Sequence, residues 1–100
     1  MNGQAYVEAV LSAVEQIPPG RVLSYGDVAE LVGGGGPRQV GQVMAIHGGA
    51  VPWWRVVRAN GSTAVRKEAG QLHLLKAEGC PIRPGGERVD MVRARWDGLS

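Results

Sequence analysis

The chain has 100 residues, 44% of them hydrophobic, and a net charge of +2, which suits one domain over residues 1–100 with a modest core. It has no run of about 18 apolar residues, so a membrane-spanning helix is excluded. Met1–Gln4 shows no basic stretch followed by an apolar one, so we expect no export signal. Its one cysteine, Cys80, excludes an internal disulfide, and we therefore expect a reduced, cytoplasmic location.

The N-terminal segment predicts a helix followed by an extended piece. Apolar residues recur at helical spacing from Gln4 to Gln16, as in an amphipathic helix with one buried face. The Pro-Pro-Gly stretch at 18–20 then ends this helix, because proline and glycine interrupt helical structure. The next residues, 21–23, are expected to be extended.

The following segments predict a helix-turn-helix. Ser24 and Asp27 have the spacing of a capping box, and the apolar residues up to Val32 indicate a short second helix. Four glycines at 33–36 break that helix, and a third helix is expected over Pro37–His47 with proline in its first turn. Two short helices joined by a glycine turn, the second basic at its start, are typical of this motif. The glycines alone would also fit a plain flexible loop.

The C-terminal half predicts a small β wing and one further long helix. Arg55–Arg58 has the composition of a strand and Asn60–Gly61 that of a tight turn, which together would form a wing beside the helix pair. Lys67–Glu78 predicts the last long helix, with Gly79 as its C-cap. Val89–Trp96 fits either a helical turn or a strand. The expected fold class is therefore mainly α with a small β wing, a winged helix-turn-helix.

Positive charges gather in the middle of the chain. No acidic residue occurs between Glu30 and Glu68, whereas five cations do, namely Arg38, Arg55, Arg58, Arg66 and Lys67. Nine of the eleven cations in the chain are arginine, which pairs with phosphates and stacks on bases better than lysine does. This pattern fits either a solvated basic face or an anion-binding face, and nucleic acid is the leading partner for the second.

Four motifs occur in a fixed order within residues 5–80. They read IPPGRVLSYGDVA, RQVGQVM, VPWWRVVRANG and LLKAEG. Together they resemble the DNA-binding domain of O6-alkylguanine-DNA alkyltransferases, which flip an alkylated guanine out of duplex DNA and move its alkyl group onto their own cysteine. The resemblance implies the fold of the alkyltransferase C-terminal domain and double-stranded DNA as the partner.

The active-site motif is where the chain departs from that family. The family reads Pro-Cys-His-Arg-Val, whereas residues 52–56 read Pro-Trp-Trp-Arg-Val, so Trp53 replaces the cysteine and Trp54 the histidine. Glu78 matches the glutamate of the same relay and is expected to lack its partners. Alkyl transfer needs an activated thiolate, which indole cannot replace, so we expect no enzymatic activity. Cys80 follows a helix C-cap with no histidine beside it and is expected to be an idle structural thiol.

A tryptophan in the cysteine position is typical of the alkyltransferase-like proteins, a branch similar in fold that binds alkylated DNA without repairing it. This resemblance implies that O6-alkylguanine lesions in duplex DNA are bound by nucleotide flipping, with the helix-turn-helix docked in the minor groove. It also implies that the lesion is marked for nucleotide-excision repair, whose proteins would be further partners. We expect a monomer, nucleoid-associated if bacterial, that needs no cofactor and, given the spacing of its two histidines, no metal.

The resemblance assigns a part in base flipping to four residues. Tyr25 would crowd the backbone beside the target nucleotide, Arg38 would enter the duplex as an arginine finger, and Trp53 would hold the flipped base. Arg66 takes the place of a lid residue, where an arginine plane over a purine adds about 1–2 kcal/mol of cation–π attraction. The full lesion pocket is expected to comprise Trp53, Arg66, Tyr25, Val51 and Pro52.

A wider set of side chains is expected to contact DNA, comprising Ser24, Tyr25, Arg38, Gln39, Gln42, Arg55, Arg58 and Lys67. Three residues also have a structural interpretation. Ser24 would cap a helix, and Arg55 would tie the backbone of its motif in place, the interpretation we favour. Trp54 would either brace the pocket or pack into the core.

Two other functions fit parts of the sequence. A winged helix-turn-helix module without lesion specificity, such as a transcription regulator, would read bases in the major groove, for which the third helix offers only Arg38, Gln39 and Gln42. An enzyme that uses Cys80 as its alkyl acceptor would gain an alkyl mass on that residue.

Overall fold

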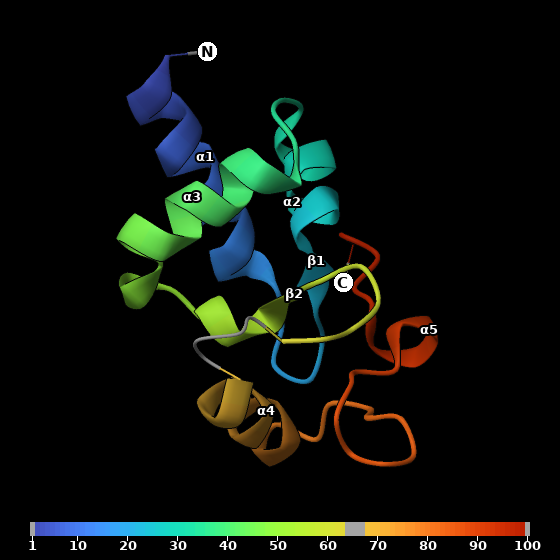
Figure 1. Cartoon of the computed structure of the whole chain (residues 1–100). Helices are drawn as coiled ribbons and strands as arrows, with labels where there is room; N and C mark the ends of the chain where they lie inside the picture. The colour runs from blue at the N-terminus through green and yellow to red at the C-terminus, as the bar shows by residue number, and fades with distance from the viewer. Residues whose placement is uncertain (1, 64–67, 100) are drawn as a thin grey trace.

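The computed structural model describes residues 2–63 and 68–99 of the chain. In chain order its elements are α1 (Gly3–Gln16), β1 (Leu23–Ser24), α2 (Tyr25–Val32), α3 (Pro37–His47), η1 (Gly48–Ala50), η2 (Trp53–Arg55), β2 (Val56–Val57), α4 (Glu68–Ala77) and α5 (Met91–Ala94). Figure 1 shows α1, α2 and α3 together in one half of the molecule and α4 in the other, with the short strands between them. No helix within the described ranges is long and apolar enough to cross a membrane.

The first three helices pack around one core of apolar side chains. Val10 and Val14 of α1, Val28 of α2 and Val40 of α3 are all fully buried in it. These positions lie on the apolar faces that the helical spacing predicts. The amphipathic first helix and the helix-turn-helix are therefore confirmed, and α3 has the predicted bounds.

Local hydrogen bonds fix where α2 and α3 begin. The Asp27 amide donates to Ser24 Oγ at 3.0 Å and the Ser24 amide donates to Asp27 Oδ2 at 3.0 Å, so the predicted capping box is confirmed. Gly33 ends α2 in the left-handed conformation at φ +86°, which glycine adopts without strain. At the start of α3, the Gly36 amide donates to Gln39 Oε1 at 3.0 Å. The glycine-rich turn therefore has a defined geometry.

The predicted β element is a short strand whose partner, β1, the sequence did not indicate. β2 contains only two residues, and it pairs in parallel with β1, Leu23 opposite Val56 and Ser24 opposite Val57. Both valines are fully buried, each in a different apolar cluster. A wing strand leaves one face in solvent, whereas a parallel strand with both faces covered lies in the interior. The small β element of the predicted fold class is thus an internal two-strand sheet.

The predicted tight turn after β2 is confirmed. The Gly61 amide donates to the Arg58 carbonyl oxygen at 2.8 Å, and Asn60 Oδ1 accepts from the Ser62 amide at 3.0 Å. The Gly61 carbonyl then accepts from the Val89 amide at 3.0 Å. The turn is thereby joined to the C-terminal segment of the chain.

The C-terminal segments complete a second core. α4 is described from Glu68 onward, and its predicted start at Lys67 lies outside the described residues. Segment 89–96 contains both predicted alternatives, a helical turn and an extended piece. α5 is the short helix, and Arg95, which follows it, forms an isolated parallel bridge with Val22. The buried members of this cluster are Val22, Val57, Leu75, Cys80, Val89 and Ala94.

Replacing Gly61 with alanine should destabilise the fold more than the same change at Gly79. Both glycines have positive φ, +87° and +77°, where alanine is strained by about 1–2 kcal/mol. A Cβ on Gly61 would also lie 2.2 Å from the Val89 carbonyl oxygen, whereas one on Gly79 would meet no atom within 4 Å. In urea unfolding, Gly61→Ala should therefore lower the free energy of unfolding by at least about 1 kcal/mol more than Gly79→Ala does. Equal losses would mean that the backbone at Val89 moves aside freely.

Candidate nucleic-acid interface

The two tryptophans of the central motif point into different parts of the molecule. Their ring centroids lie 5.8 Å apart at an interplanar angle of 87°, an edge-to-face arrangement. Trp53 packs against the core of the first three helices, whereas Trp54 packs against the second cluster. Both rings are only partly buried. The turn η2 therefore leaves Trp53 on the side of the helix-turn-helix and Trp54 on the side of α4.

Glu78 accepts hydrogen bonds from several donors, although the cysteine and histidine of the family's relay are replaced by Trp53 and Trp54. Trp54 Nε1 donates to Glu78 Oε2 at 3.0 Å. Arg55 donates to the same carboxylate from Nε at 3.1 Å and from Nη2 at 2.5 Å, and the Gly20 amide does so at 3.2 Å. Burial alone would raise the pKa of Glu78, but these hydrogen bonds outweigh it and hold the pKa below its ordinary value. The residue in the histidine position thus still donates to this glutamate.

Arg55 is anchored inside the protein. Besides its bonds to Glu78, its Nη1 donates to the Ile17 carbonyl oxygen at 2.9 Å, so each of its three nitrogens has an internal acceptor. Its guanidinium carbon also lies 5.4 Å from the centre of the Trp54 ring, within cation–π range. These contacts favour the interpretation in which Arg55 ties the motif in place over one in which it contacts a phosphate.

Gln71 is a further residue that holds this turn, and it is not among the predicted site residues. It lies on α4 and is 1% exposed. Its Nε2 donates to the carbonyl oxygens of Trp54 at 3.1 Å and Val56 at 2.7 Å. No motif marks it, although a glutamine among the apolar positions of a helix is a weak signal that a buried polar partner exists.

The parallel strand pair brings Tyr25 and Arg58 together. They directly follow Ser24 and Val57, which lie opposite each other in the sheet. Burial against the core raises the pKa of the Tyr25 phenol, while the nearby Arg58 guanidinium opposes the rise. Arg58 is exposed, whereas Ser24 is buried with its hydroxyl accepting from the Asp27 amide, the capping alternative. An aromatic ring and an exposed cationic side chain thus lie near each other at the start of α2.

The outer face of α3 carries polar and small side chains. Arg38, Gln39 and Gln42 are exposed there, as are Ala45 and Ile46 farther along the helix. Ile46 is 76% exposed and was not predicted to bind DNA, although its spacing from Gln42 places it on the same face. No carboxylate occurs on this helix, so its outer face can approach a polyanion without repulsion from its own side chains.

The remaining residues of the predicted pocket lie around Trp53 or beyond the described ranges. Val51 and Pro52 are partly buried just before η2. Val51, Tyr25 and Trp53 all pack against the core of the first three helices. Arg66 and Lys67 lie outside the described residues, and their predicted positions stay predictions.

Cys80 is buried in an environment that keeps it protonated. Its side chain is 5% exposed. Burial, together with the nearby Glu78 carboxylate, raises the pKa of the Cys80 thiol to about 11. Over the stretches 2–63 and 68–99, no group of three or more His, Cys, Asp and Glu side chains is arranged to hold a metal ion. The Cys80 thiol is therefore a poor nucleophile at neutral pH.

Comparison with known protein families identifies the family of this chain. Residues 5–80 match the family described as 6-O-methylguanine DNA methyltransferase, DNA binding domain. The chain belongs to this family. The matched range contains the helix-turn-helix, the two-strand sheet, η2 and Glu78, and hence every residue of the site described above.

Relatives in sequence and in structure agree with this membership. The DNA base-flipping protein of Escherichia coli (strain K12) is 36% identical over 98 residues, which span 93% of this chain and 75% of that protein. Alkyltransferase-like protein 1 of Schizosaccharomyces pombe is 37% identical over 89 residues, 82% of each chain. The crystal structure of S. pombe Atl1 in complex with damaged DNA containing O6-carboxymethylguanine matches with a TM-score of 0.84 and 32% identity, covering 97% of this chain and 99% of that one. The predicted fold class and the resemblance to alkyltransferase-like proteins are confirmed.

Replacing Glu78 with glutamine should destabilise the protein and make its free energy of unfolding less dependent on pH. An amide cannot match the charge-assisted bonds from Arg55, so we expect the free energy of unfolding to fall by about 2 kcal/mol near neutral pH. Because the folded-state pKa of Glu78 is lowered, the carboxylate stabilises the fold above its ordinary pKa and ceases to do so as pH falls through the folded-state pKa. Chemical unfolding at a series of pH values should show wild type and variant converging in acid.

Glu15→Gln is the matched control for that experiment. Glu15 is exposed on α1, and its replacement should change the free energy of unfolding by less than about 0.5 kcal/mol. A difference between wild type and Glu78→Gln that stays constant from neutral to strongly acidic pH would contradict the role assigned to the carboxylate.

Proposed function

We propose that this protein binds O6-alkylguanine in duplex DNA, holds the alkylated base outside the stack, and transfers no alkyl group. The observation that carries the proposal is Trp53, an aromatic ring in the motif position of the nucleophile, on a turn that Arg55 and Glu78 hold. Relatives named a base-flipping protein and an alkyltransferase-like protein, and the Atl1 complex with damaged DNA, support it. A flat ring suits a purine, because every base has a face that stacks on aromatic side chains.

The same turn explains why no alkyl transfer is expected. Transfer needs a thiolate, and the indole of Trp53 cannot supply one. The Trp54 nitrogen is a donor only and already donates to Glu78, so it cannot take a proton from a neighbouring group. Cys80, with a pKa of about 11, stays a thiol at neutral pH. The lesion is therefore bound rather than repaired.

The proposed binding mode places α3 in the minor groove. Arg38 would fill the gap that the flipped base leaves, while Gln39 and Gln42 contact the duplex around it. Tyr25 would crowd the backbone of the target nucleotide, with Arg58 near enough to pair with a phosphate. Minor-groove proteins insert wedges of this kind, and flipping costs a few kcal/mol, less at a damaged base.

The base itself would lie between an aromatic ring and a cation. Trp53 would form one wall of the pocket, and Val51 and Pro52 would continue that wall along the chain. Arg66 would close the pocket from the other side, where stacking and cation–π attraction act together. Lys67, next to it, would pair with a phosphate.

A protein that binds a lesion without removing it leaves the repair to other proteins. The resemblance to the alkyltransferase-like branch implies a handover to nucleotide-excision repair, and we include that step in the proposal. It would take place wherever the DNA lies, in the cytoplasmic nucleoid if the source is bacterial.

The proposal is tested first by titrating two short duplexes, one with a single O6-methylguanine and its unmodified twin, at two salt concentrations. We expect the lesion duplex to bind at least about tenfold more tightly, with a preference that persists at higher salt, because a pocket contact releases no counterions. Trp53→Ala and Arg38→Ala should each weaken lesion binding by roughly 1–3 kcal/mol.

Arg83→Ala is the matched control for Arg38→Ala, since it removes the same charge from an exposed position outside the site. An equal loss of affinity for the lesion duplex in these two variants would show that Arg38 does not act as the arginine finger. Equal affinities of the wild type for both duplexes, falling together with salt, would contradict the proposal and indicate a general or sequence-specific winged helix-turn-helix module.

Restoring a thiol at position 53 should not restore alkyl transfer. Trp53→Cys supplies a sulfur, but Trp54 leaves no proton acceptor beside it, so the thiolate is not generated efficiently. Intact-protein mass spectrometry after incubation with O6-methylguanine DNA should show no added methyl mass on the wild type or the variant. A methyl mass on the wild type would identify an enzyme that uses Cys80. Efficient transfer by the variant would show that the neighbouring base is not needed.

A further inference from the structure

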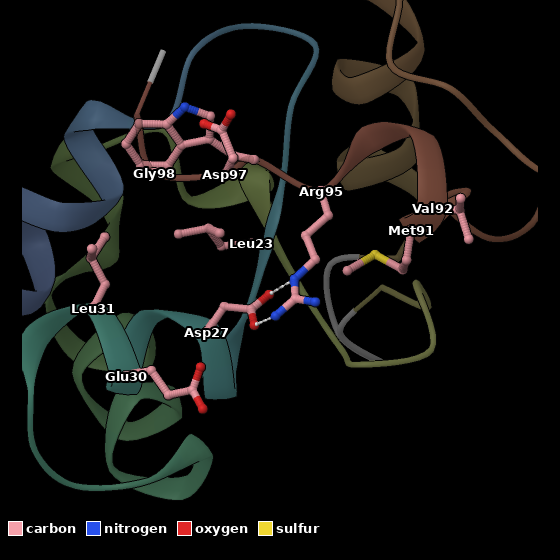
Figure 2. Close-up of a pocket in the computed structure, with 10 residues that line it drawn as sticks. Leu23, Asp27, Glu30, Leu31, Met91, Val92, Arg95, Asp97 and Gly98 are labelled. Carbon is pink, nitrogen blue, oxygen red and sulfur yellow. Dashed lines mark hydrogen bonds and ion pairs between the residues drawn. The ribbon is translucent and has the colours of Figure 1, made fainter.

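A groove lies between α2 and the C-terminal segment of the chain (Figure 2). This C-terminal groove is lined by residues of β1, α2, α5 and 95–98 and has a volume of about 600 Å³. Leu23 and Trp96 form apolar surface that reaches it from the core. Leu31 on α2 and Val92 on α5 also line it, and they are 49% and 95% exposed. The groove thus has an apolar floor and apolar edges open to solvent.

The walls of the C-terminal groove are held together by hydrogen bonds. Arg95 Nε donates to Asp27 Oδ2 at 2.9 Å and Nη2 donates to Oδ1, which ties the C-terminal segment to α2 (Figure 2). The Trp96 amide donates to the Val22 carbonyl oxygen at 2.8 Å, which fixes the same segment to the sheet. Burial would raise the pKa of Asp27, but hydrogen bonds from Arg95 and Ser24 outweigh it and keep the pKa low. The groove is therefore formed before a partner binds.

Carboxylates dominate the charge of the C-terminal groove. Asp27, Glu30 and Asp97 line it, against the single guanidinium of Arg95. None of the lining residues belongs to the set proposed to contact DNA. Phosphates would be repelled from the groove, whereas a cationic partner would be attracted to it.

We propose that the C-terminal groove is a docking site for a segment of a partner protein that presents an apolar side chain next to a lysine or arginine. The apolar side chain covers Leu31 and Val92 and rests on the floor of the groove. The cation pairs with Glu30, which lies on α2 beside Leu31. A buried apolar anchor with charged groups at its edge is the usual composition of a protein interface. Because the DNA contacts lie elsewhere, the segment and DNA can be bound together.

A second copy of this chain fits the C-terminal groove less well than such a partner. A symmetric dimer built on the groove places the same patch of each copy against the other. Carboxylates would then face carboxylates, and like-charge contacts across an interface are unfavourable. The charge of the groove is complementary to a basic segment.

The test uses the whole chain and a phage-displayed library of random dodecapeptides, with no DNA present, so that its result is independent of lesion binding. We expect the enriched peptides to combine an aliphatic or aromatic residue with lysine or arginine. Fluorescein-labelled synthetic copies should bind Leu31→Lys and Glu30→Lys at least about tenfold more weakly than wild type, because one variant loses apolar contact and the other reverses the pairing charge.

Glu15→Lys is the matched control for Glu30→Lys, since both replace an exposed glutamate on a helix by lysine. It should bind the peptides as the wild type does. All three variants should keep the wild-type ratio of affinities for the lesion duplex and its unmodified twin, which shows that the fold and the DNA site are intact.

Three results with the peptides would overturn the docking site. These are a failure to enrich any peptide, enrichment of acidic peptides, and peptides whose affinity is the same for wild type and both groove variants. Concentration-dependent self-association in sedimentation velocity that Leu31→Lys and Glu30→Lys abolish would also overturn it, because the occupant would then be a second copy.

Discussion

The position of the candidate site depends on hydrogen bonds to the carboxylate of Glu78. Glu78 follows α4 and accepts hydrogen bonds from the loop after α1, through Gly20, and from η2, through Trp54 and Arg55. Gly20 has φ +84°, and a Cβ there would lie 3.1 Å from the Glu78 carbonyl oxygen, so this close approach favours glycine. Because Trp54 and Arg55 are held from the side of α4, Trp53 is presented on the other side of the turn, against the helix-turn-helix.

Tryptophan at position 54 donates a hydrogen bond to Glu78 but has no nitrogen that can accept a proton. An imidazole can donate from one nitrogen and accept a proton at the other, whereas an indole has a donor only. Here that donor is used on Glu78, and the ring packs edge-on against Trp53 with the Arg55 guanidinium over its face. Several hydrogen bonds therefore hold the turn, which carries two aromatic rings.

Features of the fold that depend on neighbouring residues could be predicted from the sequence, and features that depend on distant ones could not. Helical periodicity and the Ser24 cap were enough for the helix-turn-helix. The composition of Val56–Val57 predicts a strand but does not indicate which segment it pairs with. The partner strand β1 precedes α2 and α3, whereas β2 follows them. The family motif marks Glu78, yet its donors come from remote segments. Gln71 carries no motif, and the C-terminal groove exists only where α2 meets the end of the chain.

α2 connects the proposed DNA site with the C-terminal groove through two different faces of one short helix. At 3.6 residues per turn, Asp27, Glu30 and Leu31 lie about 140–240° around the helix axis from Tyr25. Tyr25 packs on the core near Arg58, whereas the other three line the groove. If both proposals hold, DNA and a docked segment would therefore use different side chains of α2. Any coupling between them would have to pass through the position of this helix, which is capped at both ends and bonded to the C-terminal segment at Asp27. Such a coupling would be equal in both directions, so a segment that binds more tightly in the presence of lesion DNA would also tighten the hold on the lesion.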